Sequence, residues 1–192
     1  MGRIKKAVQL TENPHLNLYE LETQDRKGHP GCYYVASRAK HTEDLELVRK
    51  QQKPDGVIIY SLYGEKRDKV VLVRQYRYPI GRELIEIPAG TLTKGEDPME
   101  CGIRELAEET GAVAGRFTSL GSILCSPGFS DQRLYLYLAE QLSFGKNHPD
   151  EDEFLSGFRM PFEALVQKVL SGEIDDSKTV AGVLKVWAMR QK

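Results

Sequence analysis

The sequence has few cysteines, little net charge and no long apolar run, and each of these absences excludes a class of protein. Its three cysteines are widely spaced in 192 residues, and none belongs to a Cys-x-x-Cys pair or a Cys/His ligand spacing. This pattern argues against a disulfide framework and against structural zinc. A formal net charge of −1, with no long basic stripe, gives no reason to expect nucleic acid as a partner.

No apolar stretch approaches the ~18 residues of a membrane-spanning helix. The first residues, MGRIKKAVQLTENPH, also lack the apolar run of a signal peptide. We therefore expect a cytoplasmic protein that does not bind a membrane. With 40% hydrophobic residues, the chain can bury one good core and carry a small additional lobe.

Strand-like runs lie on both sides of a central helical segment. Runs of strand composition occupy residues 16–25, 29–40, 56–63, 69–77, 82–88, 116–125, 133–140 and 154–161. Helices are predicted at about 97–110, 161–172 and 177–191. This order predicts an α+β fold with a mixed sheet between helices, preceded by an antiparallel β segment. We place the boundary near residue 50, which gives an N-terminal β segment at 1–50 and a main domain at 51–192.

The central helix has clear start and stop signals. Asp97 can cap its N-terminus, Pro98 suits the first turn, and Gly111 is a natural C-terminal stop. At ~100° per residue, four apolar side chains gather on one side: Met99, Ile103, Leu106 and Ala107. Three carboxylates fall on a narrow arc roughly opposite: Glu105, Glu108 and Glu109. The pattern predicts that the helix packs by its apolar side and presents carboxylates from the other.

The crowding of these glutamates needs an explanation. A solvated acidic face is the ordinary interpretation of a glutamate-rich helix. Here, however, Glu105 faces both Glu108 and Glu109, and each like-charge pair costs roughly 0.2–0.5 kcal/mol without a counterion. Only Arg104 is adjacent. A hard divalent cation would convert the repulsion into ligation, because Mg²⁺ and Mn²⁺ prefer oxygen ligands.

The spacing around the helix is more specific than its charge. Gly90, Glu96 and the run RELAEETGA (104–112) resemble the signature of the Nudix hydrolases at every fixed polar and glycine position. Ala112 departs from it slightly, since a larger aliphatic residue is more usual there. The resemblance implies an α/β/α Nudix sandwich. Its loop–helix–loop would hold a divalent metal, Mg²⁺ or alternatively Mn²⁺, for attack on a diphosphate bridge.

The resemblance also implies roles for single residues. The implied metal ligands are Glu105, Glu109, Glu108 and the carbonyl oxygen of Ala89. Glu108 and Arg104 are implied to act in catalysis, with Arg104 orienting the glutamates by charged hydrogen bonds. Glu96 would orient them in the same way from the preceding loop.

The segment before this motif indicates a branch of the family. VRQYRYPIGRELIEIPAG (73–90) is similar to the corresponding stretch in ADP-ribose pyrophosphatases and related nucleoside-diphosphate-sugar hydrolases. Arg77 is a candidate phosphate ligand, because a guanidinium offers two donors that match phosphate geometry. It would otherwise be a surface arginine in a strand. Glu86 is either a carboxylate near the metals or half of a strand-edge salt bridge.

Two further segments carry candidate substrate-binding residues. In CSPGFSDQ, Pro127 stands at the spacing associated with the ADP-ribose branch, and its turn would place Phe129 and Ser130 at the substrate. Ser-Pro-Gly taken alone is simply a loop. Arg38 occupies a place where relatives often have an arginine that contacts phosphate or base.

The acidic run HPDEDEF remains. Such a run is usually a solvated loop. In ADP-ribose pyrophosphatases, however, a glutamate on a mobile loop here acts as base toward the attacking water. The resemblance implies Glu153 for this catalytic role, with Glu151 as the second choice.

The expected protein is thus a homodimeric Nudix pyrophosphatase whose residues 1–50 place a sheet against the partner subunit. It would hydrolyse ADP-ribose to AMP and ribose 5-phosphate. One alternative is a pyrophosphatase for another nucleoside-diphosphate sugar, such as an ADP-sugar, GDP-mannose or a UDP-sugar, because the motif handles only the diphosphate. Another is a sensor that binds a nucleotide sugar without cleaving it.

Overall fold

A computed structural model of the chain describes residues 3–49, 52–145 and 155–191. The chain forms two compact units. We call residues 1–55 with 124–133 the N-terminal unit, and residues 56–123 with 134–192 the main unit.

The N-terminal unit contains a three-stranded antiparallel sheet. Its strands, in spatial order, are β1 (Arg3–Gln9), β2 (Asn17–Gln24) and β3 (Pro30–Ser37). Its small core consists of Tyr19, Ala39 and Leu45, and a 3₁₀ turn, η1 (Thr42–Asp44), directly precedes the last of these. The sequence predicted β2 and β3 but missed β1, whose residues RIKKAVQ are mostly exposed and show no apolar alternation.

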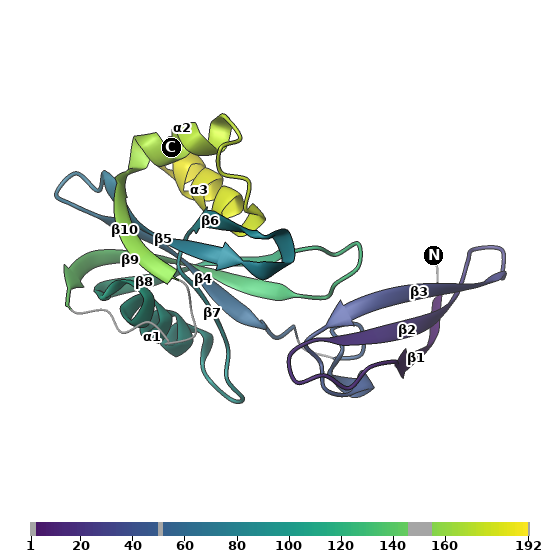
Figure 1. The fold of residues 1–192 in the computed structure, drawn as a ribbon. Coiled ribbons are helices and arrows are strands. Elements are labelled where there is room, and N and C mark those ends of the chain that lie inside the picture. Colours follow the sequence, from purple (N-terminus) through teal and green to yellow (C-terminus); the bar gives the residue numbers. More distant parts are fainter. Residues whose placement is uncertain (1–2, 50–51, 146–154, 192) are drawn as a thin grey trace. The chain divides into compact units, whose positions relative to one another are not determined.

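The main unit is built on a seven-stranded mixed sheet (Figure 1). Its strands are β4 (Gly56–Tyr63), β5 (Lys69–Arg77), β6 (Arg82–Glu86), β7 (Ala89–Thr91), β8 (Ala112–Leu124), β9 (Arg133–Phe144) and β10 (Leu155–Pro161). The order is β10-β5-β4-β9-β8, with β6 beside β5 and β7 beside β4. β4 and β9 run parallel, whereas β5 is antiparallel to β4, β6 and β10. A 3₁₀ turn, η2 (Tyr78–Ile80), separates β5 from β6.

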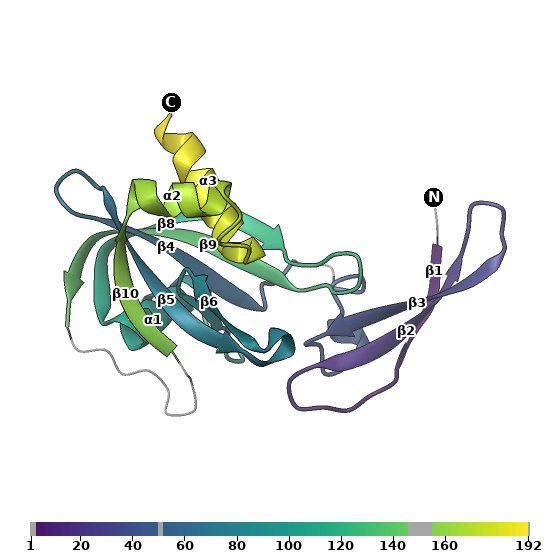
Figure 2. The same ribbon diagram turned by 45° about the horizontal axis from the view of Figure 1, so that its top comes forward.

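Helices cover both faces of this sheet. Figures 1 and 2 show α1 (Pro98–Thr110) on one face and α2 (Phe162–Leu170) with α3 (Ser177–Arg190) on the other. Consecutive strand residues serve the two faces: Ile59 lies next to Gly102 of α1, and Tyr60 lies next to Gly182 of α3. A central strand buried on both faces is continuously apolar, which accounts for the run GVIIYSLY in β4. The predicted α/β/α sandwich with a mixed sheet is confirmed.

Helix α1 begins and ends where its sequence signals predict. The Asp97 side chain accepts hydrogen bonds from the backbone N–H groups of Met99 (2.8 Å) and Glu100 (3.3 Å). At the other end Gly111 adopts a left-handed conformation, φ 68°, and its N–H donates to the carbonyl of Ala107 at 2.8 Å. Glycine meets this conformation without the steric penalty that a Cβ would bring.

The predicted packing side of α1 is only partly right: Leu106 is buried as predicted, but the predicted contacts of Met99 and Ile103 are wrong. Met99 and Ile103 are 40% and 43% exposed, whereas the buried residues of the helix are Cys101, Gly102, Leu106 and Glu109. A Cβ at Gly102 would lie 3.3 Å from the ring of Phe117, so the absence of a side chain lets the helix approach the sheet closely. The close approach that small residues allow, and not the position of the larger apolar side chains, therefore decides which side of α1 packs on the sheet. The same approach brings Glu109 to the sheet.

We expect Leu106→Ala to lower the free energy of unfolding by about 2–5 kcal/mol, because Leu106 is fully buried and truncation leaves a cavity. Leu106 belongs to the core cluster that contains Val57, Ile59 and Tyr137. Urea denaturation measures the change. Ile103→Ala is the matched control on the exposed side of the same helix, with an expected loss below about 1 kcal/mol. Equal losses in the two variants would contradict the observed packing.

Candidate active site

The chain between β6 and β7 is held from two sides. The carbonyl of Pro88 accepts a hydrogen bond from the backbone N–H of Ile59 in β4, at 2.8 Å. The backbone N–H of Ala89 donates to Oε2 of Glu109, at 3.2 Å. The buried carboxylate of Glu109 therefore binds the backbone of the residue whose carbonyl is predicted to be a metal ligand.

Gly90 makes room for a second carboxylate. A Cβ placed on Gly90 would lie 2.0–2.1 Å from Cδ, Cγ and Oε1 of Glu105, which is far inside van der Waals contact. The glycine is therefore required for close approach of backbone and side chain. Glu105 and Glu109, one helical turn apart, thus reach two consecutive residues: Glu109 binds the backbone of Ala89, and Glu105 lies beside Gly90.

Arg104 connects the remaining carboxylates. Its Nε and Nη2 donate to the two oxygens of Glu96, at 2.9 and 3.2 Å. Its Nη1 donates to Oε1 of Glu105 at 3.0 Å and to Oε2 of Glu108 at 2.9 Å. Glu96 also accepts hydrogen bonds from the backbone and hydroxyl of Thr93. The orienting role of Arg104 and Glu96 stays a prediction, and these are the contacts through which it would act.

The charges of this cluster stabilise one another. The guanidinium of Arg104, followed by the backbone N–H of Thr93, lowers the pKa of Glu96 to about 2. Hydrogen bonding to Glu96 in turn raises the pKa of Arg104. Burial, reinforced by the nearby charges of Glu96 and Glu105, raises the pKa of the Cys101 thiol to about 12. At ordinary pH, Arg104 and Glu96 are therefore both ionised and lie beside a neutral Cys101 thiol.

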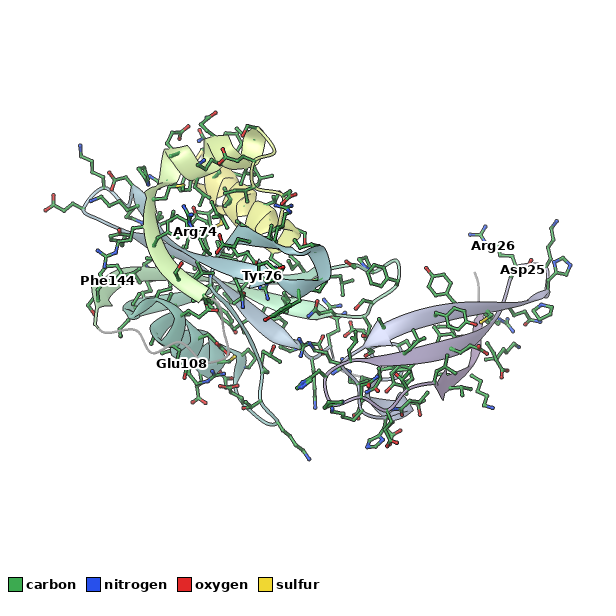
Figure 3. The ribbon with its side chains drawn as sticks, in the orientation of Figure 1. Asp25, Arg26, Arg74, Tyr76, Glu108 and Phe144 are labelled. Atoms are coloured by element: carbon green, nitrogen blue, oxygen red, sulfur yellow. The ribbon has the colours of Figure 1, made fainter. Side chains whose placement is uncertain are left out.

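The donor set suits a hard divalent cation. The predicted ligands supply only carboxylate and carbonyl oxygens, which Mg²⁺ and Mn²⁺ prefer. Glu108 is 40% exposed, and in Figure 3 it lies on the side of α1 away from α2 and α3. Within residues 3–49, 52–145 and 155–191, no three His, Cys, Asp or Glu side chains are arranged so that they could hold a metal ion. Arg104 instead donates hydrogen bonds to oxygens of Glu105 and Glu108.

Arg77 and Glu86 form a salt bridge beside this cluster. Nε and Nη2 of Arg77 donate to the two oxygens of Glu86, at 2.7 and 2.6 Å. Glu86 is 1% exposed, and Nζ of Lys178 lies 3.2 Å from its Oε2. Glu86 first, and then the charges of Asp176 and Glu109, raise the pKa of Arg77. Sequence analysis missed Lys178 and Asp176, which lie in and before the last helix and belong to no recognisable motif.

The four predicted substrate-binding residues other than Arg77 lie together in the N-terminal unit: Arg38, Pro127, Phe129 and Ser130. The backbone N–H of Ala36 in β3 donates to the carbonyl of Phe129 at 2.8 Å, and Ala36 pairs with Ser130. The hydroxyl of Tyr33 donates to the carbonyl of Gly128. The Ser-Pro-Gly-Phe turn is thus attached to β3, and Arg38 follows directly after that strand.

Charged side chains, of which Arg133 is buried, hold the end of the same loop. Nε and Nη2 of Arg133 donate to Oε1 of Glu46, at 3.1 and 2.6 Å. Asp131 accepts from the backbone N–H of Glu46 at 3.0 Å, and Asp55 accepts from that of Arg133 at 2.9 Å. These contacts explain why residues 124–133 belong to the N-terminal unit although strands of the main unit flank them.

The two candidates for the catalytic base, Glu153 and Glu151, lie outside the described residues. Their assignment stays a prediction. In the part of the chain that the structure describes, no helix is both long and apolar enough to span a membrane.

Comparison with known proteins identifies the family of the chain. The sequence profile of the NUDIX domain matches residues 52–182. The chain belongs to the Nudix hydrolase family. This Nudix hydrolase is 36% identical to the ADP-ribose pyrophosphatase of Bacillus subtilis (strain 168) over 152 residues, which cover 74% of this chain and 81% of the relative. It is 40% identical to the methanol dehydrogenase activator of Bacillus methanolicus over 144 residues, which cover 74% and 75%.

A solved structure resembles the fold of this Nudix hydrolase over nearly its whole length. The crystal structure of an ADP compounds hydrolase superposes with a TM-score of 0.79 and covers 99% of this chain and 95% of its own. The two sequences are 18% identical. At that identity the likeness concerns the fold, and it supports the α+β architecture described above.

Proposed function

We propose that this Nudix hydrolase cleaves the diphosphate of ADP-ribose and releases AMP and ribose 5-phosphate, with Mg²⁺ or alternatively Mn²⁺. The observation that carries the proposal is the convergence of Glu105 and Glu109 on the backbone of Ala89 and Gly90. The similarity to an ADP-ribose pyrophosphatase supports ADP-ribose as the substrate.

We assign different roles to the residues of the site. Glu105, Glu108 and Glu109, with the carbonyl of Ala89, would hold the metal. A divalent cation bound there supplies positive charge to the diphosphate and acidifies the attacking water. Arg104 keeps two of the carboxylates turned toward each other through its hydrogen bonds. We assign proton removal to Glu153.

Two arginines are proposed to recognise the substrate. Arg77 would meet a phosphate, because its guanidinium keeps 35% exposure while Glu86 fixes its orientation. Arg38, which is exposed, would contact phosphate or base together with the turn that carries Pro127, Phe129 and Ser130.

We also propose that the sheet at residues 1–50 forms a homodimer with a second copy of the chain. Four large apolar side chains of this sheet are exposed: Ile4, Leu18, Tyr33 and Tyr34. A shallow hollow of about 450 Å³ lined by Ile4, Leu21, Pro30 and Tyr33 is part of the same sheet. Ile4, Leu21 and Tyr33 share one face of the sheet, which is the proposed interaction surface, whereas Leu18 and Tyr34 lie on the opposite face. Sedimentation equilibrium that gave only the 21.7 kDa single chain would contradict the dimer.

The experiment that tests the function is product identification. Purified protein is incubated with Mg²⁺ and separately with ADP-ribose, ADP-glucose, GDP-mannose, UDP-glucose and NADH, and the products are identified by mass spectrometry. We expect preferential release of AMP and ribose 5-phosphate from ADP-ribose, and no release with EDTA in place of Mg²⁺. Preference for another sugar would keep the chemistry and change the substrate. Binding of ADP-ribose without any turnover would contradict hydrolysis and favour a sensor.

A further inference from the structure

The first turn of α3 contacts the segment between β6 and β7, which leads into the candidate active site. Asp176 caps this helix, and its Oδ2 accepts from the backbone N–H of Thr179 at 2.9 Å and from the hydroxyl at 2.8 Å. The same hydroxyl oxygen accepts from the backbone N–H of Ile87 at 3.0 Å. Thr179 is fully buried. The start of α3 therefore fixes the backbone immediately before Pro88 and Ala89.

Lys178 makes a second contact from this turn. Its Nζ lies 3.2 Å from Oε2 of Glu86 and 2.5 Å from Oδ1 of Asp176. Burying a carboxylate as deeply as that of Glu86 costs free energy unless positive charge and hydrogen bonds compensate for the lost solvation. Arg77 supplies positive charge and hydrogen bonds, Lys178 supplies positive charge at ion-pair distance, and both approach the same oxygen, Oε2. Lys178 therefore shares with Arg77 the carboxylate that orients Arg77.

The orientation of Arg77 matters because of its surroundings. Two of its nitrogens are committed to Glu86, the side chain remains partly exposed, and the charge of Glu109 acts on it. A guanidinium is planar and binds phosphate well only in a defined orientation. A shift of Glu86 would turn the guanidinium, and with it the direction in which Arg77 meets an anion.

We propose that Lys178 is a positioning residue for phosphate recognition: it holds Glu86, and Glu86 holds Arg77. Lys178 itself does not touch the substrate. Asp176 and Thr179 contribute by fixing the start of α3. This inference rests on the proposed function, since it takes the ligand of Arg77 to be the diphosphate of a nucleotide sugar.

The first test separates binding from chemistry. For Lys178→Met we expect the KM for ADP-ribose to rise about tenfold while kcat changes less than about twofold, because misplacing an orienting group weakens ligand binding. The Kd of ADP-ribose measured by calorimetry in EDTA should rise by the same factor. Lys178→Arg should restore most of the wild-type KM. Lys168→Met is the matched control, and its KM should not change. Lys168 lies on α2, the helix next to α3, and pairs with the exposed carboxylate of Glu173, which follows α2.

The second test asks whether Lys178 acts through Arg77. In an Arg77→Met background, Lys178→Met should raise KM no further, because coupled residues are non-additive in a double-mutant cycle. If the effects of the two substitutions on KM multiplied in the double variant, the proposal would be overturned. A wild-type KM in Lys178→Met would also overturn it. Lys178→Gln, which removes the charge but keeps a polar side chain at this position, allows the same cycle if the methionine variant is poorly folded. A wild-type protein that cleaves no nucleotide sugar would instead refute the proposed function.

Discussion

Glu109→Gln is expected to lower kcat for the preferred nucleotide sugar by about 10³-fold. Glu109 is 4% exposed, and its carboxylate accepts a hydrogen bond from the N–H of Ala89 at 3.2 Å. Glutamine keeps the shape and can keep that hydrogen bond, but it removes the negative charge that a divalent cation requires. The measurement is kcat at saturating substrate and Mg²⁺, by product mass or phosphate-coupled assay.

Stability measurements separate this effect from misfolding. Like charges on α1 repel without a cation, so the melting temperature of Glu109→Gln in EDTA should equal or exceed that of the wild type. Mg²⁺ with substrate should raise the wild-type melting temperature and leave that of the variant nearly unchanged. Glu100→Gln, in the exposed first turn of the same helix, is the control and should keep kcat. A Glu109→Gln enzyme with full Mg²⁺-dependent turnover would refute the assigned role.

Gly90→Ala is expected to lower kcat/KM by about 10²-fold. The new Cβ would occupy the space of the Glu105 carboxylate, since the closest atoms would be 2.0–2.1 Å away. These atoms belong to the flexible side chain of Glu105, which can move away from the new Cβ. The substitution should therefore displace Glu105 and reduce activity, and it should change the stability of the fold much less. The measurements are kcat/KM and the melting temperature of the same preparation.

A glycine in the loop between β7 and α1 gives the contrasting control. Gly95 has φ +87°, and a Cβ added to it would meet no atom within 4 Å beyond its chain neighbours, so alanine there brings backbone strain but no clash. We expect Gly95→Ala to lose about 1–2 kcal/mol of stability and to keep kcat/KM near the wild-type value. Gly90 is thus needed because it leaves space for Glu105, and Gly95 because of its backbone conformation. If Gly90→Ala retained both kcat/KM and the Mg²⁺-dependent melting shift, the site would not depend on this close approach.

The sequence by itself determined the parts of this protein that depend on neighbouring residues. Asp97 and Gly111 mark the ends of α1 because capping and a left-handed terminal residue are local effects. The spacing from Gly90 to Ala112 identified the family and the glutamates, since 23 contiguous residues contain the whole loop and helix. The α+β class followed from the order of strand and helix patterns.

Only the tertiary structure decided which side of α1 is buried. The pattern of apolar residues favoured Met99 and Ile103, yet both are exposed and Glu109 is buried. Packing depends on the shape of the facing sheet, and the absence of a side chain at Gly102 allows an approach that bulkier residues would prevent. Strand β1 was missed for a related reason: a polar strand is stabilised by pairing with β2, which its own residues do not indicate.

Contacts between distant segments were also beyond the sequence. Thr179 meets Ile87 across 92 residues, and Lys178 meets Glu86 at a similar separation. The loop at 124–133 joins the N-terminal unit through Glu46 and Asp55. Lysine, threonine and aspartate are common surface and capping residues, so their types carry no signal of a distant partner. The fold alone brings such residues together, because burial of the whole core selects one arrangement of the elements.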